Sequence, residues 1–211
     1  MILKLQNVQV LRGERALFAP ISLKLDAGET VTVMGPSGCG KSTLLAAVCG
    51  NLASCFTLRG DILLDGRSVL PVPMEKRKIG ILFQDDLLFP HMNVAENLAF
   101  ALPQKLPKRL KGEKVADALK KAGLSGFEKR DPATLSGGQR ARVSLMRSLL
   151  AEPKAILLDE PFSKLDRQLR ERIRRFVFDV LRKGKIPALL VTHDPMDCPE
   201  GRVIDLEVER R

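Results

Sequence analysis

The nine residues GPSGCGKST, Gly35 to Thr43, restrict the possible folds of this chain more than any other stretch. They match the pattern G-x-x-x-x-G-K-[ST], a loop whose backbone N–H groups converge on the phosphates of a nucleotide. The pattern needs a strand before it and a helix after it, because the positive end of that helix completes the phosphate site. The run TVTVM precedes the loop and the helix-spaced run STLLAAVCG follows it, so the sequence meets both requirements.

Two positions of this loop have specific expected roles in binding a nucleotide together with Mg²⁺. Lys41 is expected to reach the β- and γ-phosphates, and Ser42 to ligate Mg²⁺. The alternative is a glycine-rich turn between a strand and a helix, with an exposed lysine. The predicted nucleotide-binding residues of the loop are Gly35, Pro36, Ser37, Gly38, Cys39, Gly40, Lys41, Ser42 and Thr43.

Hydrophobic periodicity outlines a sheet-rich first part of the chain. LKLQNVQV, ISLKLDAGETVTVMG and GDILLDG alternate like short strands, with a turn at residues 26–28. A helix is expected directly after the phosphate loop, and Gly50 is placed to end it. A further buried strand is expected at 79–84.

The pattern becomes helical in the middle and then returns to strands. Asn93 and Glu96 have capping-box spacing at the start of NVAENLAFAL, and the helical run GEKVADALKKAG follows. AILLD and PALLVTHD are continuous apolar runs of the kind buried on two faces. Between them lies an amphipathic helix that Asp166 is placed to cap and Gly184 to follow. Strand, helix and strand in this order imply a parallel pair.

These elements predict one α/β domain over residues 1–211. Its fold class is a P-loop NTPase core with a mixed or parallel sheet, an N-terminal antiparallel β part and an inserted α-helical subdomain. The nucleotide-binding core is expected at 1–85 and 155–211, and the inserted subdomain at about 86–154.

The stretch AILLDEP places two acidic side chains at the carboxyl end of a predicted buried strand, the edge at which open α/β sheets bind ligands. Asp159 can hold a metal ion, and Glu160 can accept a proton from an attacking water. Acidic pairs at strand ends also serve as helix caps. The phosphate loop upstream favours the catalytic interpretation.

A second glycine motif, LSGGQ, occupies residues 135–139. Ser136 and Gln139 have capping-box spacing and open a helix. A capping box does not require Gly137 and Gly138 in the first turn, where each costs up to about 1 kcal/mol relative to alanine. Their lack of side chains is explained if a phosphate approaches the N–H groups of this helix end.

In chain order, the phosphate loop, Gln84, LSGGQ, LLDEP, SKLD and VTHD resemble the ATP-binding cassette (ABC) family over nearly the whole chain. The resemblance implies hydrolysis of ATP with Mg²⁺. It also implies that two cassettes meet head to tail, so that each ATP lies between the phosphate loop of one and the LSGGQ of the other. Ser136, Gly137, Gly138 and Gln139 would then contact the nucleotide of a partner, either a second copy of this chain or a paralogous cassette.

The same resemblance assigns roles to three further positions. Gln84 would touch Mg²⁺ and the attacking water, His193 would contact the γ-phosphate and orient Glu160, and Asp166 would lie at the dimer seam. Outside this family context, Gln84 would be an exposed strand-end amide and His193 a structural histidine. The predicted catalytic residues are Glu160, His193, Gln84 and Lys41, and the predicted metal ligands are Ser42, Gln84 and Asp159.

The chain departs from the family pattern in three places. Arg12 stands where many members carry an aromatic ring that stacks on adenine, and Phe18 is the nearest aromatic residue. An arginine plane can also stack, so Arg12 is the expected adenine contact, while base selectivity stays open. Lys164 replaces a small residue in the segment SKLD. Only a short stretch follows VTHD, so no appended regulatory domain is expected.

Composition limits the classes of partner. The 35 Lys+Arg against 25 Asp+Glu give a net charge of +10, which suits nucleic acid, anionic lipid or nucleotide phosphates, or is a solvated basic surface. Aromatic residues make up 4% of the chain, too few for base stacking to favour a nucleic-acid partner. The four cysteines are scattered, which favours reduced thiols in a cytosolic protein. No apolar run approaches the ~18 residues that cross a bilayer, so a membrane role would need a partner or a surface contact.

Within the family, LFQDDLLFPHMNVAENLAFAL resembles the segment with which importer cassettes grip their transmembrane partner, and Phe162 is common in that branch. The sequence therefore predicts the ATPase subunit of a bacterial importer, peripheral at the cytoplasmic face of the inner membrane. Its partners would be integral-membrane permease subunits and, indirectly, a periplasmic binding protein. The alternatives are an exporter or lipoprotein-release ATPase, and a soluble ABC ATPase acting on nucleic acid or ribosomes.

The residues 87–90 (LLFP) would form a partly exposed apolar docking patch in the importer interpretation. The alternative is that they cover the core of the helical subdomain.

Overall fold

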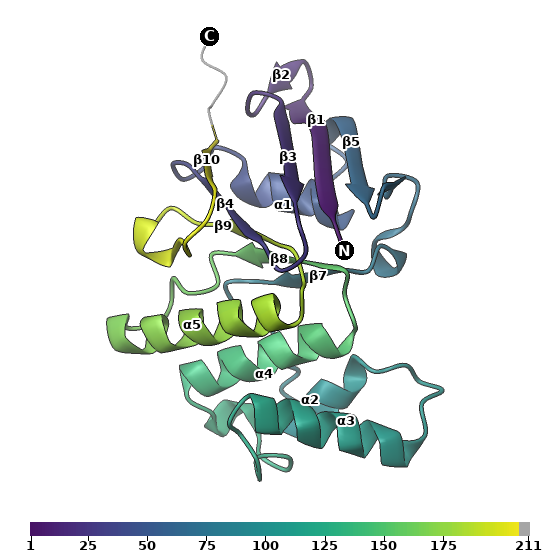
Figure 1. The fold of residues 1–211 in the computed structure, drawn as a ribbon, viewed down its shortest axis with the longest axis vertical. Helices are drawn as coiled ribbons and strands as arrows, with labels where there is room; N and C mark the ends of the chain where they lie inside the picture. Colours follow the sequence, from purple (N-terminus) through teal and green to yellow (C-terminus); the bar gives the residue numbers. More distant parts are fainter. Residues whose placement is uncertain (207–211) are drawn as a thin grey trace. The chain divides into compact units, whose positions relative to one another are not determined.

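The computed structural model describes residues 1–206, and the contacts of the chain divide it into two compact units (Figure 1). The sheet unit comprises Met1–Ile81, Lys154–Glu160 and the residues from Phe178 onward. The helical unit comprises Leu82–Pro153 and Pro161–Val177. Residues 161–177, which the sequence analysis grouped with the core, are assigned to the helical unit by these contacts.

The first sheet of the sheet unit is antiparallel, as expected for the N-terminal part. Its order is β2-β1-β5-β6, with β3 also paired to β1. Leu3 pairs with Leu25 of β3 and with Leu64 of β5, so that a row of buried leucines lines one face. The strands are β1 (Leu3–Arg12), β2 (Arg15–Ala16), β3 (Ile21–Leu25), β5 (Phe56–Leu64) and β6 (Arg67–Ser68).

The second sheet has the order β10-β4-β9-β8-β7, and the pairs β10–β4, β4–β9 and β8–β9 are parallel. Every residue of β9 and all but the last of β8 are buried, as the continuous apolar runs predict. The strands are β4 (Thr30–Met34), β7 (Ile79–Leu82), β8 (Ala155–Asp159), β9 (Ala188–Val191) and β10 (Val203–Asp205).

The predicted turn at 26–28 is present, and it leads from β3 of the antiparallel sheet to β4 of the parallel one. One detail of the predicted strands needs correction. The strand expected at 79–84 ends at Leu82, its only buried residue, and Phe83 is 41% exposed. Gln84 therefore lies in the segment after the strand.

Helix α1 (Lys41–Cys49) forms the centre of the sheet unit. Its Leu44, Leu45 and Val48 are completely buried in one cluster with side chains of both sheets, and the helix contacts β1 and β8. Burying these three side chains contributes roughly 5–9 kcal/mol of transfer free energy. Gly50 ends the helix with a φ of 94°, as predicted.

Arg77 neutralises the carboxyl end of α1. Its guanidinium donates to Ala47 O (3.1 Å) and Val48 O (3.0 Å) of the helix, and to Val72 O (2.8 Å) and Leu70 O (3.3 Å) of the loop before β7. The residue is 8% exposed, and burial lowers the pKa of Arg77. No carboxylate within residues 1–206 pairs with this buried cation, which is acceptable because the last carbonyls of a helix carry partial negative charge.

The helical unit packs three helices around a second apolar core, and Figure 1 shows α2, α3 and α4 together in teal and green. The capping boxes predicted for Asn93 with Glu96 and for Ser136 with Gln139 are confirmed. Its helices are α2 (Val94–Phe100), α3 (Lys108–Lys121) and α4 (Gly137–Leu150), followed by α5 (Arg167–Lys183), which ends in the sheet unit. Short 3-10 turns are η1 (Met74–Lys76), η2 (Pro132–Thr134) and η3 (Pro195–Asp197).

Helix α5 provides the expected crossover between β8 and β9, and the Leu169 N–H donates to its cap Asp166 at 3.0 Å.

Over residues 1–206, none of the helices has the combination of length and hydrophobicity that spanning a membrane requires.

We predict that Arg77→Met lowers the free energy of unfolding by about 3 kcal/mol, because four carbonyls lose their donor and two of them end a buried helix. Urea denaturation followed by circular dichroism measures the change. Lys76→Met, at the exposed neighbouring position, is the control and should change stability by less than about 0.5 kcal/mol. Equal effects of the two substitutions would contradict the capping role of Arg77.

Candidate functional site

The phosphate loop joins β4 to α1, and the side chain of Lys41 folds back onto the loop. The Lys41 ammonium donates to Gly35 O at 2.7 Å and to Pro36 O at 2.9 Å, and Lys41 is 6% exposed. Gly40 caps the helix with a φ of 100°, a conformation that glycine adopts without strain. An incoming phosphate would replace the two carbonyls as the partner of the Lys41 ammonium.

The surroundings of this loop separate the two candidates for contact with a base. Phe18 is completely buried, and a Cβ added to Gly40 would lie 3.0 Å from Phe18 Cδ1. The ring therefore supports the loop and is not available for stacking. Arg12, at the end of β1, is exposed and remains the candidate from the sequence.

Ser42 and Asp159 place two hard oxygen ligands together at the carboxyl ends of the parallel strands. The Ser42 hydroxyl donates to Asp159 Oδ1 at 3.1 Å. Burial raises the pKa of Asp159, the Ser42 hydrogen bond and the Lys41 charge lower it, and Glu160 raises it further. A carboxylate and a hydroxyl fit Mg²⁺, which usually takes one or two protein oxygens and completes its shell with phosphate and water.

Glu160 and His193 face each other because their strands are neighbours. Asp159 pairs with Val191 across β8 and β9, so the residues that follow the two strands lie side by side. His193 Nδ1 is 3.0 Å from Glu160 Oε1. Glu160 has a φ of 44°, a left-handed conformation that is uncommon for residues other than glycine and is concentrated at functional sites.

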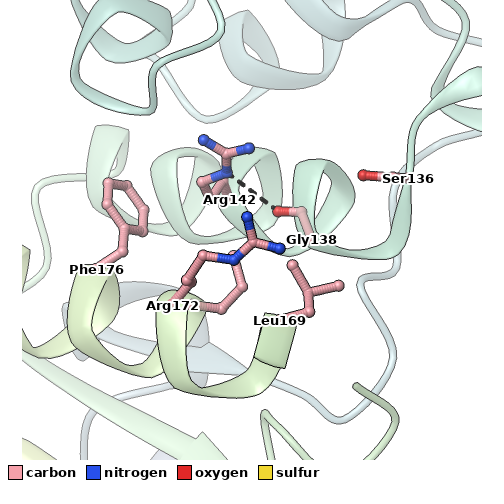
Figure 2. Close-up of a pocket in the computed structure, with 7 residues that line it drawn as sticks. Ser136, Gly138, Arg142, Leu169, Arg172 and Phe176 are labelled. Atoms are coloured by element: carbon pink, nitrogen blue, oxygen red, sulfur yellow. Dashed lines mark hydrogen bonds between the residues drawn. The ribbon is translucent and has the colours of Figure 1, made fainter. Parts of the chain in front are cut away.

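The two glycines of LSGGQ, at the start of α4, differ in their surroundings. A Cβ added to Gly138 would lie 2.5 Å from Leu169 Cδ1 and 3.3 Å from Ile173 Cδ1, whereas the nearest atom to a Cβ on Gly137 would be 3.8 Å away. Figure 2 shows Leu169 facing Gly138. The sequence argument explained both glycines by the approach of a ligand. The structure gives Gly138 a second reason, close packing against α5, whereas a Cβ on Gly137 would make only ordinary van der Waals contacts.

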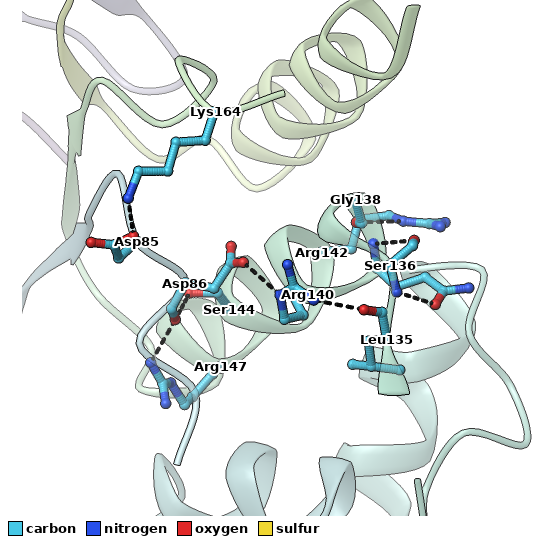
Figure 3. A network of polar contacts seen from close by, with 11 residues as sticks. Asp85, Asp86, Leu135, Ser136, Gly138, Arg140, Arg142, Ser144, Arg147 and Lys164 are labelled. Carbon is cyan, nitrogen blue, oxygen red and sulfur yellow. Dashed lines mark hydrogen bonds and ion pairs between the residues drawn. The ribbon is translucent and has the colours of Figure 1, made fainter. Parts of the chain in front are cut away.

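Two neighbouring carboxylates after β7 connect that segment to the SKLD segment and to α4 (Figure 3). Asp85 forms an ion pair with Lys164 of the SKLD segment, and Asp86 Oδ2 lies 3.4 Å from Arg140 Nε of α4. Burial raises the pKa of Asp86, while Arg140 lowers it. Sequence reasoning missed both acids, although the unusual Lys164 was the signal that could have indicated a partner.

The same segment borders a groove of about 450 Å³. Leu87, which has a φ of 44° and is 55% exposed, lines it together with Leu88 and Pro90. Its other walls come from the start of α4 and from residues 161–165. Of the predicted patch, Leu87 and Pro90 are exposed and Leu88 and Phe89 are half-buried.

Asn97 fixes the conformation of the apolar segment 87–92 by hydrogen bonds to its backbone. The side chain is completely buried, accepts from the Phe89 N–H at 2.8 Å, and donates to Phe89 O at 3.1 Å and Met92 O at 2.9 Å. The Phe89 ring packs against Phe100, with centroids 4.7 Å apart, and Phe100 is 62% exposed. The sequence analysis did not identify Asn97, because a polar residue on a helix gives no sign of its partners.

The sheet unit thus brings together five of the predicted residues, namely Lys41, Ser42, Asp159, Glu160 and His193. The remaining loop positions Gly35–Gly40 and Thr43 also belong to it, as does Arg12. Gln84, Ser136, Gly137, Gly138 and Gln139 belong to the helical unit.

Comparison with known proteins gives consistent results. A family model described as "ABC transporter" matches residues 18–163. The chain is 48% identical over 206 residues to an uncharacterized ABC transporter ATP-binding protein, YnjD, of Escherichia coli strain K12, covering 97% of this chain and 95% of that protein. It is 40% identical over 194 residues to the spermidine/putrescine import ATP-binding protein PotA of Mesoplasma florum, covering 92% of this chain.

The chain spans 55% of the length of that PotA protein. Among solved structures, it is similar to a chain described as "Dimeric Structure of MJ0796, a Bacterial ABC Transporter Cassette". The TM-score is 0.79 at 30% identity, and the match covers 99% of this chain and 97% of that one.

We predict that Gly138→Ala is less favourable for the free energy of unfolding than Gly137→Ala by about 1 kcal/mol, because both gain helix propensity but only the methyl group at 138 must displace Leu169 Cδ1. Gly137→Ala, where a Cβ would make only ordinary van der Waals contacts, should leave it unchanged or slightly higher. Adding Leu169→Ala to Gly138→Ala should remove the overlap, so the two effects should not be additive in urea denaturation. Additive losses would refute the packing explanation.

A second prediction follows from the raised pKa of Asp159. The folded protein disfavours the ionised carboxylate, so Asp159→Asn should raise the melting temperature by a few degrees at neutral pH. This gain should vanish as the pH falls below about 4, where the acid is protonated in both folded and unfolded states. The same variant should lose its stabilisation by Mg-ATP.

Asp65 supplies a control of opposite sign, because hydrogen bonds from Lys154 and from the Ile2 N–H lower its pKa. Asp65→Asn should lower the melting temperature at neutral pH and lose its effect in acid. The same sign of effect for both substitutions would argue against the pKa basis of the prediction.

Proposed function

The chain belongs to the ABC transporter family, and on that premise we propose that it is the ATP-hydrolysing subunit of a bacterial importer. Two copies, or one copy and a paralogous cassette, would enclose two ATP molecules head to tail and drive a permease in the membrane. The observation that carries the transport part is the groove beside Leu87, an apolar surface held in shape at the edge of the helical unit.

In this proposal the sheet unit holds the nucleotide. The phosphate loop from Gly35 to Thr43 would surround the phosphates, with Lys41 exchanging its carbonyl partners for phosphate oxygens. Ser42 and Asp159 would hold Mg²⁺, which neutralises charge on the β- and γ-phosphates. Arg12 would contact the base from the end of β1.

Glu160 is the proposed general base. It would accept a proton from the attacking water, and His193, 3.0 Å away, would orient its carboxylate. The strained backbone at Glu160 supports this role, because the surrounding strands hold the side chain in one position. Gln84 would complete the site from the segment that follows β7.

The LSGGQ motif would act on the nucleotide of the partner cassette. Gly137 leaves the N–H groups at the start of α4 accessible, and Ser136 and Gln139 already satisfy each other in the capping box. A phosphate can therefore approach this helix end without displacing a side chain. The similarity to a cassette whose structure is described as dimeric supports a dimer.

The permease would dock at the groove beside Leu87. An exposed leucine and the exposed Phe100 are costly in water and are typical of a surface that a partner covers. Asn97 holds the loop through hydrogen bonds to its backbone, so the surface exists before the partner arrives. The relatives named as import ATP-binding proteins favour import, with a peripheral position at the cytoplasmic membrane face and a periplasmic binding protein as indirect partner.

Co-purification with the membrane subunits encoded by neighbouring genes tests this proposal. We expect Leu87→Asp to reduce capture of the chain by tagged permease at least about tenfold, because a charge enters an apolar contact. ATP turnover of the isolated chain should stay within about twofold of the unmodified protein. Met74→Asp, at an exposed apolar position of the sheet unit, is the control and should bind normally. Equal capture of the Leu87→Asp chain would exclude the groove as the docking site.

A further inference from the structure

A second hollow, of about 270 Å³, lies in the helical unit between the flanks of α4 and α5. Ser136, Gly138 and Arg142 of the α4 side line it, and Leu169, Arg172, Ile173 and Phe176 line it from α5. Figure 2 shows both guanidinium groups lying between Phe176 and Gly138. We call it the α4–α5 hollow.

The hollow carries two cations and no acid. Arg142 donates to Ala122 O at 2.7 Å and to Gly138 O at 3.3 Å, so it is held in place by backbone carbonyls and not by a carboxylate. No hydrogen bond or ion pair within residues 1–206 engages the guanidinium of Arg172. Burial lowers the pKa of Arg142, and the nearby positive charge of Arg172 lowers it further.

Most carboxylates of the helical unit are engaged with other groups. Glu171, next to Arg172 in the chain, pairs with Arg175, and Asp166 caps α5. The other ion-paired acids of this unit are Asp85, Asp86, Glu113 and Glu152, with Lys164, Arg140, Arg109 and Lys114 respectively. Two like charges beside one hollow therefore have no counter-ion among these acids, and an external anion would relieve their repulsion.

The rest of the lining is apolar. Ile173 is 4% exposed, and Leu169 and Phe176 are half-buried beside it. The Ser136 hydroxyl is already occupied, since it accepts from the Gln139 N–H of its own helix. The hollow thus combines two cationic side chains with apolar ones, and its volume suits a small ligand.

We propose that the α4–α5 hollow binds a small organic oxyanion, a phosphate or carboxylate on an apolar stem. The oxyanion would lie between Arg142 and Arg172, where planar guanidinium groups can each donate two parallel hydrogen bonds. The stem would cover Ile173 and Phe176. Because Gly138 lines the same hollow, the ligand would sit against the first turn of α4, which makes it suited to control that helix.

Titration with phenyl phosphate tests the site directly in the full chain. The methyl group of Ile173, followed by nuclear magnetic resonance, reports binding in the hollow and not at the phosphate loop. We expect saturable shifts, weakened about tenfold by Arg172→Gln, which removes a charge-assisted contact. Arg175→Gln, on the same helix but paired with Glu171, is the matched control and should leave the affinity unchanged.

Inorganic phosphate, phenylacetate and benzyl alcohol test the contribution of the apolar stem and of the charged group separately. Phe176→Ala should weaken phenyl phosphate but not inorganic phosphate, and phenylacetate compared with phenyl phosphate distinguishes a carboxylate from a phosphate ligand. Uncharged benzyl alcohol should not compete. Shifts that stay linear to 20 mM, equal weakening by Arg172→Gln and Arg175→Gln, or full competition by benzyl alcohol would each overturn the proposal.

Discussion

The burial of α1 between two sheets is the constraint on which the sheet unit depends. The helix must present apolar side chains to both sheets while its ends remain polar, and each end is satisfied differently. At the amino end the Lys41 ammonium takes the carbonyls of Gly35 and Pro36, and Gly40 caps the helix. At the carboxyl end the buried Arg77 takes the last carbonyls and ties them to the loop before β7. The helix is thereby fixed at both ends without an acidic partner.

Several features outside α1 lower the stability of the isolated chain, which is the pattern expected of binding sites. Asp159 and Asp86 have raised pKa values because burial outweighs their cationic neighbours. Glu160 and Leu87 have left-handed backbone conformations. Arg142 and Arg172 repel each other beside a hollow. In the proposed functions, binding of a nucleotide, a partner or an anion would offset these costs.

Much of the fold could be predicted from the sequence because local patterns encode it. Strands β8 and β9, the capping boxes at Asn93 and Ser136, and the end of α1 at Gly50 each have a signal within a few residues. The assignment of β3 and β4 to different sheets has no such signal, because strand pairing depends on residues far apart in the chain. The length of the strand at 79–84 was overestimated for a related reason, since Phe83 is apolar but exposed.

The sequence by itself determined the chemistry of this protein: the phosphate loop, the acids after AILLD, the LSGGQ motif and, through their order, the ABC family. Those signals are local, since each depends on residue types at fixed spacing. Only the tertiary structure decided which side chains are accessible and which are paired. It buried Phe18 and exposed Arg12, gave Gly138 a packing role that Gly137 lacks, and brought Arg142 and Arg172 to one hollow. The physical reason is that burial, steric overlap and charge repulsion depend on distances in space, which residue spacing alone does not specify.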